Sequence, residues 1–164
     1  MKKVLALVVI LVLVPLAAFA DSNRIFDNAG LFSETDAIEL NAAIKRFQEQ
    51  TNLDIVILTT DDFLGEFNQK GIADSFYDSQ GFGLDSVNSG ILFYIDMNQR
   101  QQYLSTTGKL IEMLDDKNIE KMLDATNPYL TKGAYKEAAQ ALIKFLTEIY
   151  SAYLENDTSI TSTK

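Results

Sequence analysis

The sequence predicts an α/β protein, a three-layer α/β/α sandwich whose small sheet is mainly parallel with one hairpin. Three observations support this fold: two apolar runs typical of buried strands, helix-period stretches that alternate with them, and a tight polar connection after the second run. A crossover through a helix makes the two strands parallel, and the hairpin adds an antiparallel neighbour. The chain has 164 residues, enough for one domain of this kind.

The first twenty residues read as a targeting segment. Lys2-Lys3 is followed by the apolar run Val4 to Val14 and by Ala18-Phe19-Ala20, which has the small residues of a cleavage site. We interpret residues 1–20 as a signal peptide that is cleaved near Ala20, which predicts export to the periplasm or the extracellular space. An uncleaved membrane anchor is the alternative, because the apolar stretch is nearly long enough to span a bilayer.

The remaining elements follow from local patterns. Residues 23–32 are expected to be extended, and Ser33 to Asp36 resembles a capping box that begins a helix. The pattern then predicts a strand at Ile55–Thr59, a helix at Phe67–Ser79, a strand at Ile91–Ile95, a hairpin strand at Gln101–Thr106, a helix at Asp116–Ala125 stopped by Asn127-Pro128, and a helix from Ala134 to about Leu154. The predicted domain covers residues 21–155, and residues 156–164 form a flexible polar tail.

Composition excludes several function classes. The chain has no histidine and no cysteine, so it contains no Ser-His-Asp triad, no Cys-His dyad and no imidazole or thiolate zinc site. The formal net charge of -9 argues against a nucleic-acid partner, because such binding depends on lysine and arginine. We expect a monomer whose partner is a divalent cation or a protein of the envelope or membrane.

Acidic residues concentrate near one predicted rim of the sheet, where the loop at residues 81–90 and the exit of the hairpin strand meet. The acidic and amide side chains of this rim are Asp74 and Asp78, one helical turn apart, Asp85 and Asn88 in the loop, and Asp115 with Asp116 further on. Converging carboxylates repel unless a hard cation neutralises them, so this pattern predicts calcium or magnesium. The alternative is that these residues are helix caps and solvated surface acids.

Arg100 stands apart from this acidic group, in the predicted hairpin connection. Its guanidinium could hold a phosphate or a carboxylate through two parallel hydrogen bonds. The alternative is a structural salt bridge at the end of the hairpin, with Asp96 as the partner.

An ordered set of short motifs runs along about residues 25–150. The set consists of Asp27 to Ser33, Asp54 to Thr59, Ala73 to Asp78, Gly81 to Gly83, Gly90 to Phe93, Arg100, Ser105 to Gly108, and Gly133 to Tyr135. In order and spacing these motifs resemble the TPM domain, a family of thylakoid-lumen phosphatase-like proteins and exported bacterial proteins.

The resemblance implies an exported α/β/α sandwich with a calcium-binding acidic cleft and, in some members, acid-phosphatase-like activity. Carried over to this chain, the metal ligands would be Asp27, Asp78, Asp85 and Asp115. Asp74 and Asp116 would be supporting acids, and Asn88 and Lys109 would lie beside the cleft in supporting positions of this chain's own. Asn88 and Lys109 depart from the family pattern, and both should weaken cation binding.

Two functions therefore follow as hypotheses. The first is an exported metal-binding protein that acts as a weak metal-dependent phosphate-ester hydrolase, although a negative cleft is a poor host for an anionic substrate. The second is a non-catalytic calcium-binding module that presents a surface to an envelope partner. The sequence leaves open whether the protein is an enzyme.

Overall fold

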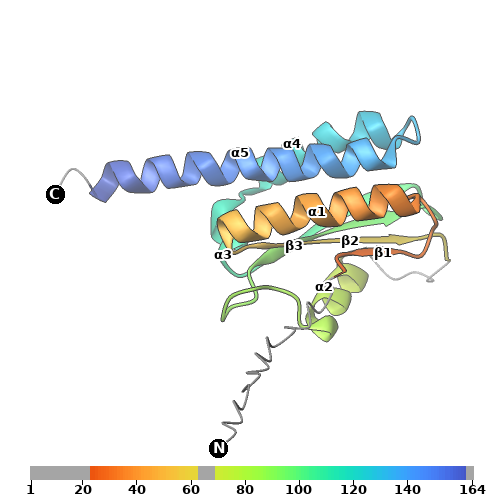
Figure 1. Cartoon of the computed structure of the whole chain (residues 1–164), viewed down its shortest axis with the longest axis horizontal. Coiled ribbons are helices and arrows are strands. Elements are labelled where there is room, and N and C mark those ends of the chain that lie inside the picture. The colour runs from red at the N-terminus through yellow and green to blue at the C-terminus, as the bar shows by residue number, and fades with distance from the viewer. Residues whose placement is uncertain (1–22, 63–68, 162–164) are drawn as a thin grey trace, which may run out of the picture.

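The three-dimensional structure is a computed structural model that describes residues 23–62 and 69–161 (Figure 1). The predicted signal peptide, residues 1–20, lies outside these ranges. Within them, no helix combines the length and the apolar character that a membrane span requires.

One four-stranded sheet forms the centre of the molecule. Its strands are β1 (Ile25–Asp27), β2 (Asp54–Thr60), β3 (Gly90–Asp96) and β4 (Gln101–Thr107), in that spatial order. The first three strands are parallel, and β4 pairs antiparallel with β3 through the hairpin. The predicted mixed sheet is therefore confirmed. The carboxyl ends of β1, β2 and β3 define one edge, called here the C-terminal edge, and their amino ends define the N-terminal edge.

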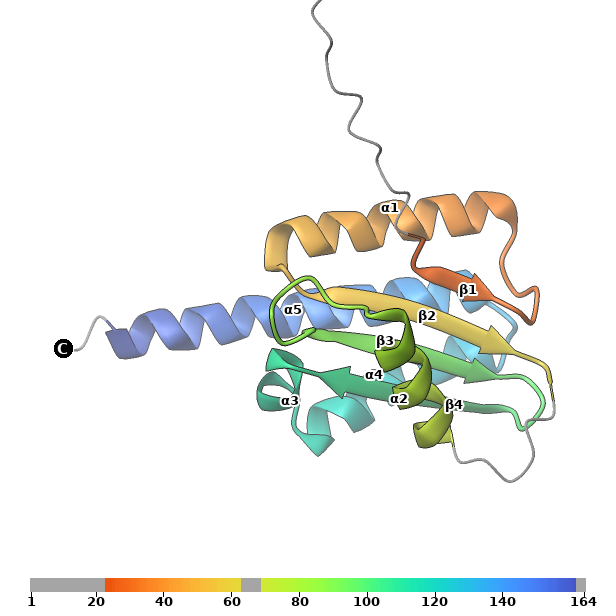
Figure 2. The ribbon, with the colours of Figure 1, turned by 90° about the horizontal axis from the view of Figure 1, so that it is seen from below.

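Helices cover both faces of the sheet, which confirms the three layers. The helices are α1 (Glu34–Thr51), α2 (Gln69–Gln80), α3 (Lys109–Met113), α4 (Asp116–Leu130) and α5 (Tyr135–Thr161). Figure 2 shows α2 in front of the sheet and α4 and α5 behind it. The predicted capping box begins α1, where Ser33 and Asp36 bond reciprocally.

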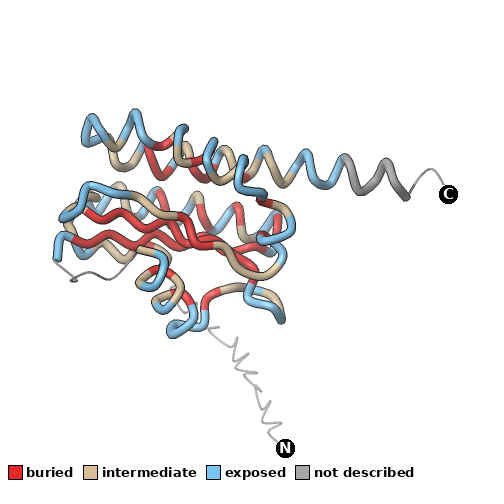
Figure 3. The backbone as a smooth tube through the Cα atoms, turned by 180° about the vertical axis from the view of Figure 1, so that it is seen from behind, coloured by how far each residue is buried: buried red, intermediate tan, exposed pale blue. Residues whose placement is uncertain are grey.

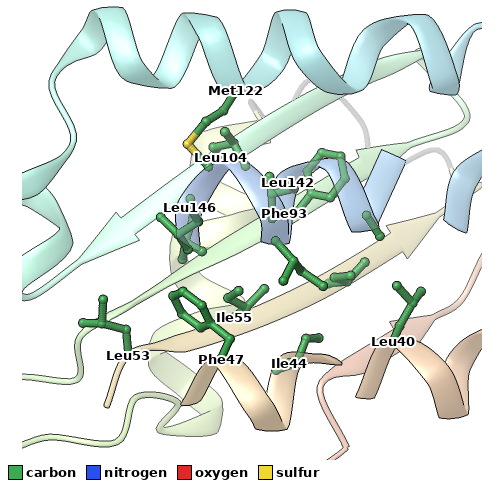
Figure 4. Close-up of a cluster of buried hydrophobic side chains, with 14 of the residues drawn as sticks. Leu40, Ile44, Phe47, Leu53, Ile55, Phe93, Leu104, Met122, Leu142 and Leu146 are labelled. Carbon is green, nitrogen blue, oxygen red and sulfur yellow. The ribbon is translucent and has the colours of Figure 1, made fainter. Parts of the chain in front are cut away.

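The period-two alternation of the strands divides the core into two parts. Strand residues Ile55 and Phe93 face α1, α4 and α5, where they pack with Phe47 and Leu142 (Figure 4). The neighbouring strand residues face α2. They form a smaller cluster consisting of Val56, Leu58, Ala73, Tyr77, Phe82, Leu92 and Tyr94. Strands β2 and β3 are buried along their whole length, as expected for parallel strands covered on both faces (Figure 3).

The helix boundaries depart from the predictions in three places. Helix α4 continues through Pro128 to Leu130, so the predicted stop at Asn127-Pro128 is wrong. Proline removes one helical hydrogen bond, but α4 packs along α5 and this contact keeps the last turn helical. Helix α5 reaches Thr161, beyond the predicted end near Leu154, because no proline or glycine interrupts it. The short helix α3 was not predicted.

A buried carboxylate, that of Asp54 at the start of β2, joins three other segments. Its side chain is 0% exposed and accepts hydrogen bonds from Arg24 Nε at 2.8 Å, Gln48 Nε2 at 2.7 Å and Gly83 N at 2.9 Å. The Arg24 guanidinium also lies over the ring of Phe82, 5.2 Å from its centroid. This junction therefore fixes the chain before β1, the last turns of α1 and the loop before β3.

Replacing Asp54 by alanine should lower the free energy of unfolding by about 3–5 kcal/mol, because it leaves Arg24 and Gly83 N without their acceptor inside the protein. Asp54→Asn has the same shape and retains one acceptor oxygen, so it should cost less. Urea unfolding followed by circular dichroism measures both variants. A loss below about 1 kcal/mol for the alanine variant, the range of a surface ion pair, would contradict this account of the junction.

Candidate functional site

The structure places Asp27, the first predicted metal ligand, at the C-terminal edge of the sheet. Its carboxylate accepts hydrogen bonds from Leu31 N at 2.9 Å and Phe32 N at 2.8 Å. Thr59 Oγ1, on the adjacent strand, donates a third bond at 2.5 Å. Asp27 therefore shapes the turn between β1 and α1 and ties it to β2.

Asp85 lies at the opposite, N-terminal edge, within the loop of residues 81–89. Its carboxylate accepts bonds from Ser89 N and Ser89 Oγ, both at 2.9 Å, and from Val87 N at 3.2 Å. Lys109 Nζ forms an ion pair with it at 3.0 Å. The Ser89 amide foremost, and then Lys109, hold the pKa of Asp85 well below its usual range. Asn88 has left-handed backbone and offers its main-chain oxygen to Thr107 Oγ1.

Asp115 and Asp116 belong to the start of α4. Asp115 is the N-cap residue and accepts a hydrogen bond from Asn118 N at 2.8 Å. Asp116 is exposed in the first turn, where a negative charge is favourable to the helix dipole. These are the roles of helix caps and surface acids.

Two of the predicted acids do lie in one place. Asp74 and Asp78, on α2, line a pocket of about 260 Å³ between that helix and β4. Asp74 is bonded to Lys70 and accepts a hydrogen bond from Ser105 Oγ at 2.5 Å. Asp78 is exposed, and its carboxylate has no hydrogen bond or ion pair to any described residue.

The four predicted ligands Asp27, Asp78, Asp85 and Asp115 thus do not form one donor set. Over residues 23–62 and 69–161, no group of three acidic side chains is placed to hold a metal ion. The physical reason is local, since Asp27, Asp85 and Asp115 each accept main-chain N–H bonds that close their own turns. The described residues therefore do not fit the calcium cleft that the family resemblance implies.

A cavity of about 380 Å³ lies at the C-terminal edge, beside the hairpin. The end of β3, the hairpin and β4 form one wall, and the last turns of α4 and the start of α5 form the other. Its lining residues are Ile95, Asp96, Met97, Arg100, Gln101, Gln102, Asn127, Leu130, Thr131 and Tyr135.

Among the described residues that line this cavity, Arg100 is the only cation. Its backbone is left-handed, with a φ of 57°, a conformation that costs a non-glycine residue energy. Within the described part of the chain its guanidinium forms no ion pair, so the salt bridge with Asp96 that we considered is not formed. Asp96 is 3% exposed and instead accepts a bond from Gln99 N at 2.9 Å, which closes the hairpin.

A sequence model of the TPM domain matches residues 25–149. The chain belongs to the TPM domain family. No curated protein matches the sequence.

The solved structures that resemble this TPM domain include three solution structures of bacterial proteins. The N-terminal domain of a P. gingivalis protein, solved by NMR, has a TM-score of 0.71 and 22% identity and covers 83% of this chain and 87% of its own. The N-terminal domain of the cg2496 protein from Corynebacterium glutamicum has a TM-score of 0.61 and 16% identity over 80% of each chain. The BA42 protein from Bizionia argentinensis has a TM-score of 0.60 and 11% identity over 72% of this chain and 83% of its own. At these identities the likeness supports the fold alone.

The sequence predicts a binding role for one wall of the TPM domain's cavity and not for the other. It points to Arg100, whereas a predicted helix end at Ala125 would keep Asn127 and Thr131 away from the hairpin. One signal was present. Gly133 to Tyr135 is part of the family resemblance, and Tyr135 lines the cavity opposite Arg100.

Acid should weaken the loop of residues 81–89 through Asp85. Because folding lowers the pKa of Asp85, its contribution to stability is present above the unfolded value near pH 4 and is lost as the pH falls further. Asp85→Asn should therefore flatten the decline in unfolding free energy below about pH 4. The measurement is urea unfolding at a series of acidic pH values. The control is Glu49→Gln, which removes an exposed carboxylate on α1. If the unfolding free energy of Asp85→Asn falls with pH as steeply as that of the unmodified protein, Asp85 does not stabilise the loop in the way described.

Proposed function

We propose that this TPM domain is an exported binding module that holds a small anionic group, a phosphate ester or a carboxylate, in the cavity beside Arg100. The observation that carries the proposal is an unpaired guanidinium on the wall of a cavity at the C-terminal edge of a parallel sheet. Ligands of open α/β sheets bind preferentially at this edge, outside the carboxyl ends of the strands.

The cavity has the size and the mixed lining of a small-molecule site. Its volume of about 380 Å³ lies in the range of ligand pockets, and Ile95, Met97 and Leu130 give it apolar walls. Arg100 supplies a planar fork of donors that matches the two oxygens of a carboxylate or a phosphate. This combination suits a ligand with an apolar body and one anionic end.

The strained backbone of Arg100 supports a binding role. A glycine or asparagine would adopt the left-handed conformation at this hairpin position more readily than arginine. Since the guanidinium makes no bond within the described protein that would compensate for this cost, its stabilising contact is assigned to a ligand.

Binding fits this cavity better than hydrolysis does. Among the described residues that line it, the only carboxylate is that of Asp96, which is almost buried and bonded to the hairpin. The whole chain contains no histidine or cysteine. Export and an envelope partner remain part of the proposal. They are supported by the signal-peptide pattern of residues 1–20 and by the exported members of the family.

Arg100→Gln should weaken the binding of phenyl phosphate and of benzoate at least about tenfold, because it removes the charge from the fork. Arg100→Lys should recover only part of the affinity, since a lysine presents a point charge. Amide chemical shifts in NMR titrations give the dissociation constants, and comparison of the two probes tells which anionic group is preferred.

The matched control is Arg46→Gln, which removes an exposed arginine from α1 and should leave binding unchanged. Phenyl phosphate is also monitored for release of phenol, and we expect no release that depends on Arg100. Equal affinities of the unmodified protein and the Arg100→Gln variant would contradict the proposed site. Phenol release that is lost with Arg100→Gln would favour the hydrolase.

A further inference from the structure

The two edges of the sheet differ in how they are protected. Strand β1 forms one edge, and it is three residues long, with Arg24 before it and the charged Asp27 as its last residue. Short strands and charged residues are the usual means by which proteins prevent further pairing at an edge. Strand β4 forms the other edge and has none of these features.

β4 is a regular, uncharged strand. Its seven residues, Gln101–Thr107, contain no lysine, acid or proline, and the register with β3 runs without a bulge from Gly90 opposite Thr107 to Asp96 opposite Gln101. Among the described residues, only β3 bonds to its main chain. In Figure 2, β4 is the outermost strand, with α2 on one side of the sheet plane. The unpaired N–H and C=O groups along β4 therefore form a template for another strand.

A polar groove runs beside this edge on the α2 face. It is the pocket of about 260 Å³ lined by Lys70, Asp74 and Asp78 from the helix and by residues Tyr103–Thr107 from β4. Lys70 is bonded to Asp74. The Asp78 side chain is exposed, and no hydrogen bond or ion pair joins its carboxylate to another described residue. Side chains of an added strand alternate between the two faces, so every second one would point toward this groove.

We propose that β4 binds an extended peptide segment of a partner protein by strand addition, with a lysine or arginine of the segment paired to Asp78. In this mode main-chain hydrogen bonds to β4 supply affinity, and the groove beside α2 supplies selectivity for a basic side chain. The inference is independent of the anion site at Arg100, which lies at the hairpin end of the same strand.

The charge of the protein favours a basic peptide segment over a second copy of the chain as the partner of β4. The formal net charge of the protein is -9, so two copies repel each other. A second β4 carries no charged residue and would bring no cation from its strand to Asp78. A basic extended segment would bond to the unpaired main-chain groups of β4 and place a cation beside the Asp78 carboxylate.

The test uses the full chain and three peptides of nine residues. The first alternates threonine and valine with two lysines spaced to face the groove, the second has glutamates in place of the lysines, and the third repeats the first with N-methyl groups on every amide. Fluorescence anisotropy gives the affinities, and hydrogen exchange reports protection of the β4 amides. The lysine peptide should bind at least about tenfold more tightly than the glutamate peptide, weaken with salt, and protect β4.

Two variants decide where the peptide binds. Asp78→Asn should reduce the affinity for the lysine peptide about fivefold or more, and Asp124→Asn, an exposed acid of α4 outside the groove, should not. Equal binding of the N-methylated peptide would overturn strand addition, and equal effects of the two variants would overturn the role of Asp78. Failure of the lysine peptide to bind at millimolar concentration, or a dimer in ultracentrifugation that Thr106→Lys dissociates, would overturn the proposal. None of these results depends on Arg100.

Discussion

The carboxylate of Asp54 is the interaction on which the arrangement of this domain depends. It is fully buried, and a buried charge is stable only when its hydrogen bonds are satisfied, here by a guanidinium, a side-chain amide and a main-chain N–H. These donors come from the segment before β1, from α1 and from the loop before β3. One carboxylate thus holds β1 beside β2 and anchors the loop of residues 81–89 at the N-terminal edge.

The same chemistry recurs on a smaller scale across the chain. Asp27, Asp85 and Asp115 accept main-chain N–H groups of the residues that follow them, which organises a turn or begins a helix. An acidic composition in this protein therefore stabilises connections between elements. Among the described residues, the guanidinium of Arg100 beside the hairpin and the carboxylate of Asp78 beside the edge strand form no ion pair, and each lines a pocket.

The parts of the fold that depend on local patterns could be predicted from the sequence. Two apolar runs predict β2 and β3, and Ser33 with Asp36 predicts the start of α1. Both patterns depend only on residues that are near one another in the sequence. The end of helix α4 could not be predicted, because packing on α5 lets its last turn continue beyond Pro128. Tertiary contacts of this kind override local preference.

The site residues were harder to predict for a related reason. Spacing shows which acidic residues are near one another in the sequence. It does not show whether their carboxylate oxygens already accept hydrogen bonds from main-chain N–H groups. The family resemblance places Asp27 in one cleft with Asp85, and the sequence alone does not predict that residues 25–27 pair with a neighbouring strand. Once β1 pairs parallel with β2, Asp27 must lie at the opposite edge of the sheet from Asp85.

Main-chain N–H groups bond to the carboxylates of Asp27, Asp85 and Asp115, and over the described residues these acids do not form one donor set. We therefore infer that no calcium ion bridges the three. Carbon-13 NMR of the aspartate side chains during a calcium titration measures this. We expect the carboxyl resonances of the three residues to stay in place as calcium reaches millimolar concentration, whereas saturable shifts with one common dissociation constant would show a shared metal site.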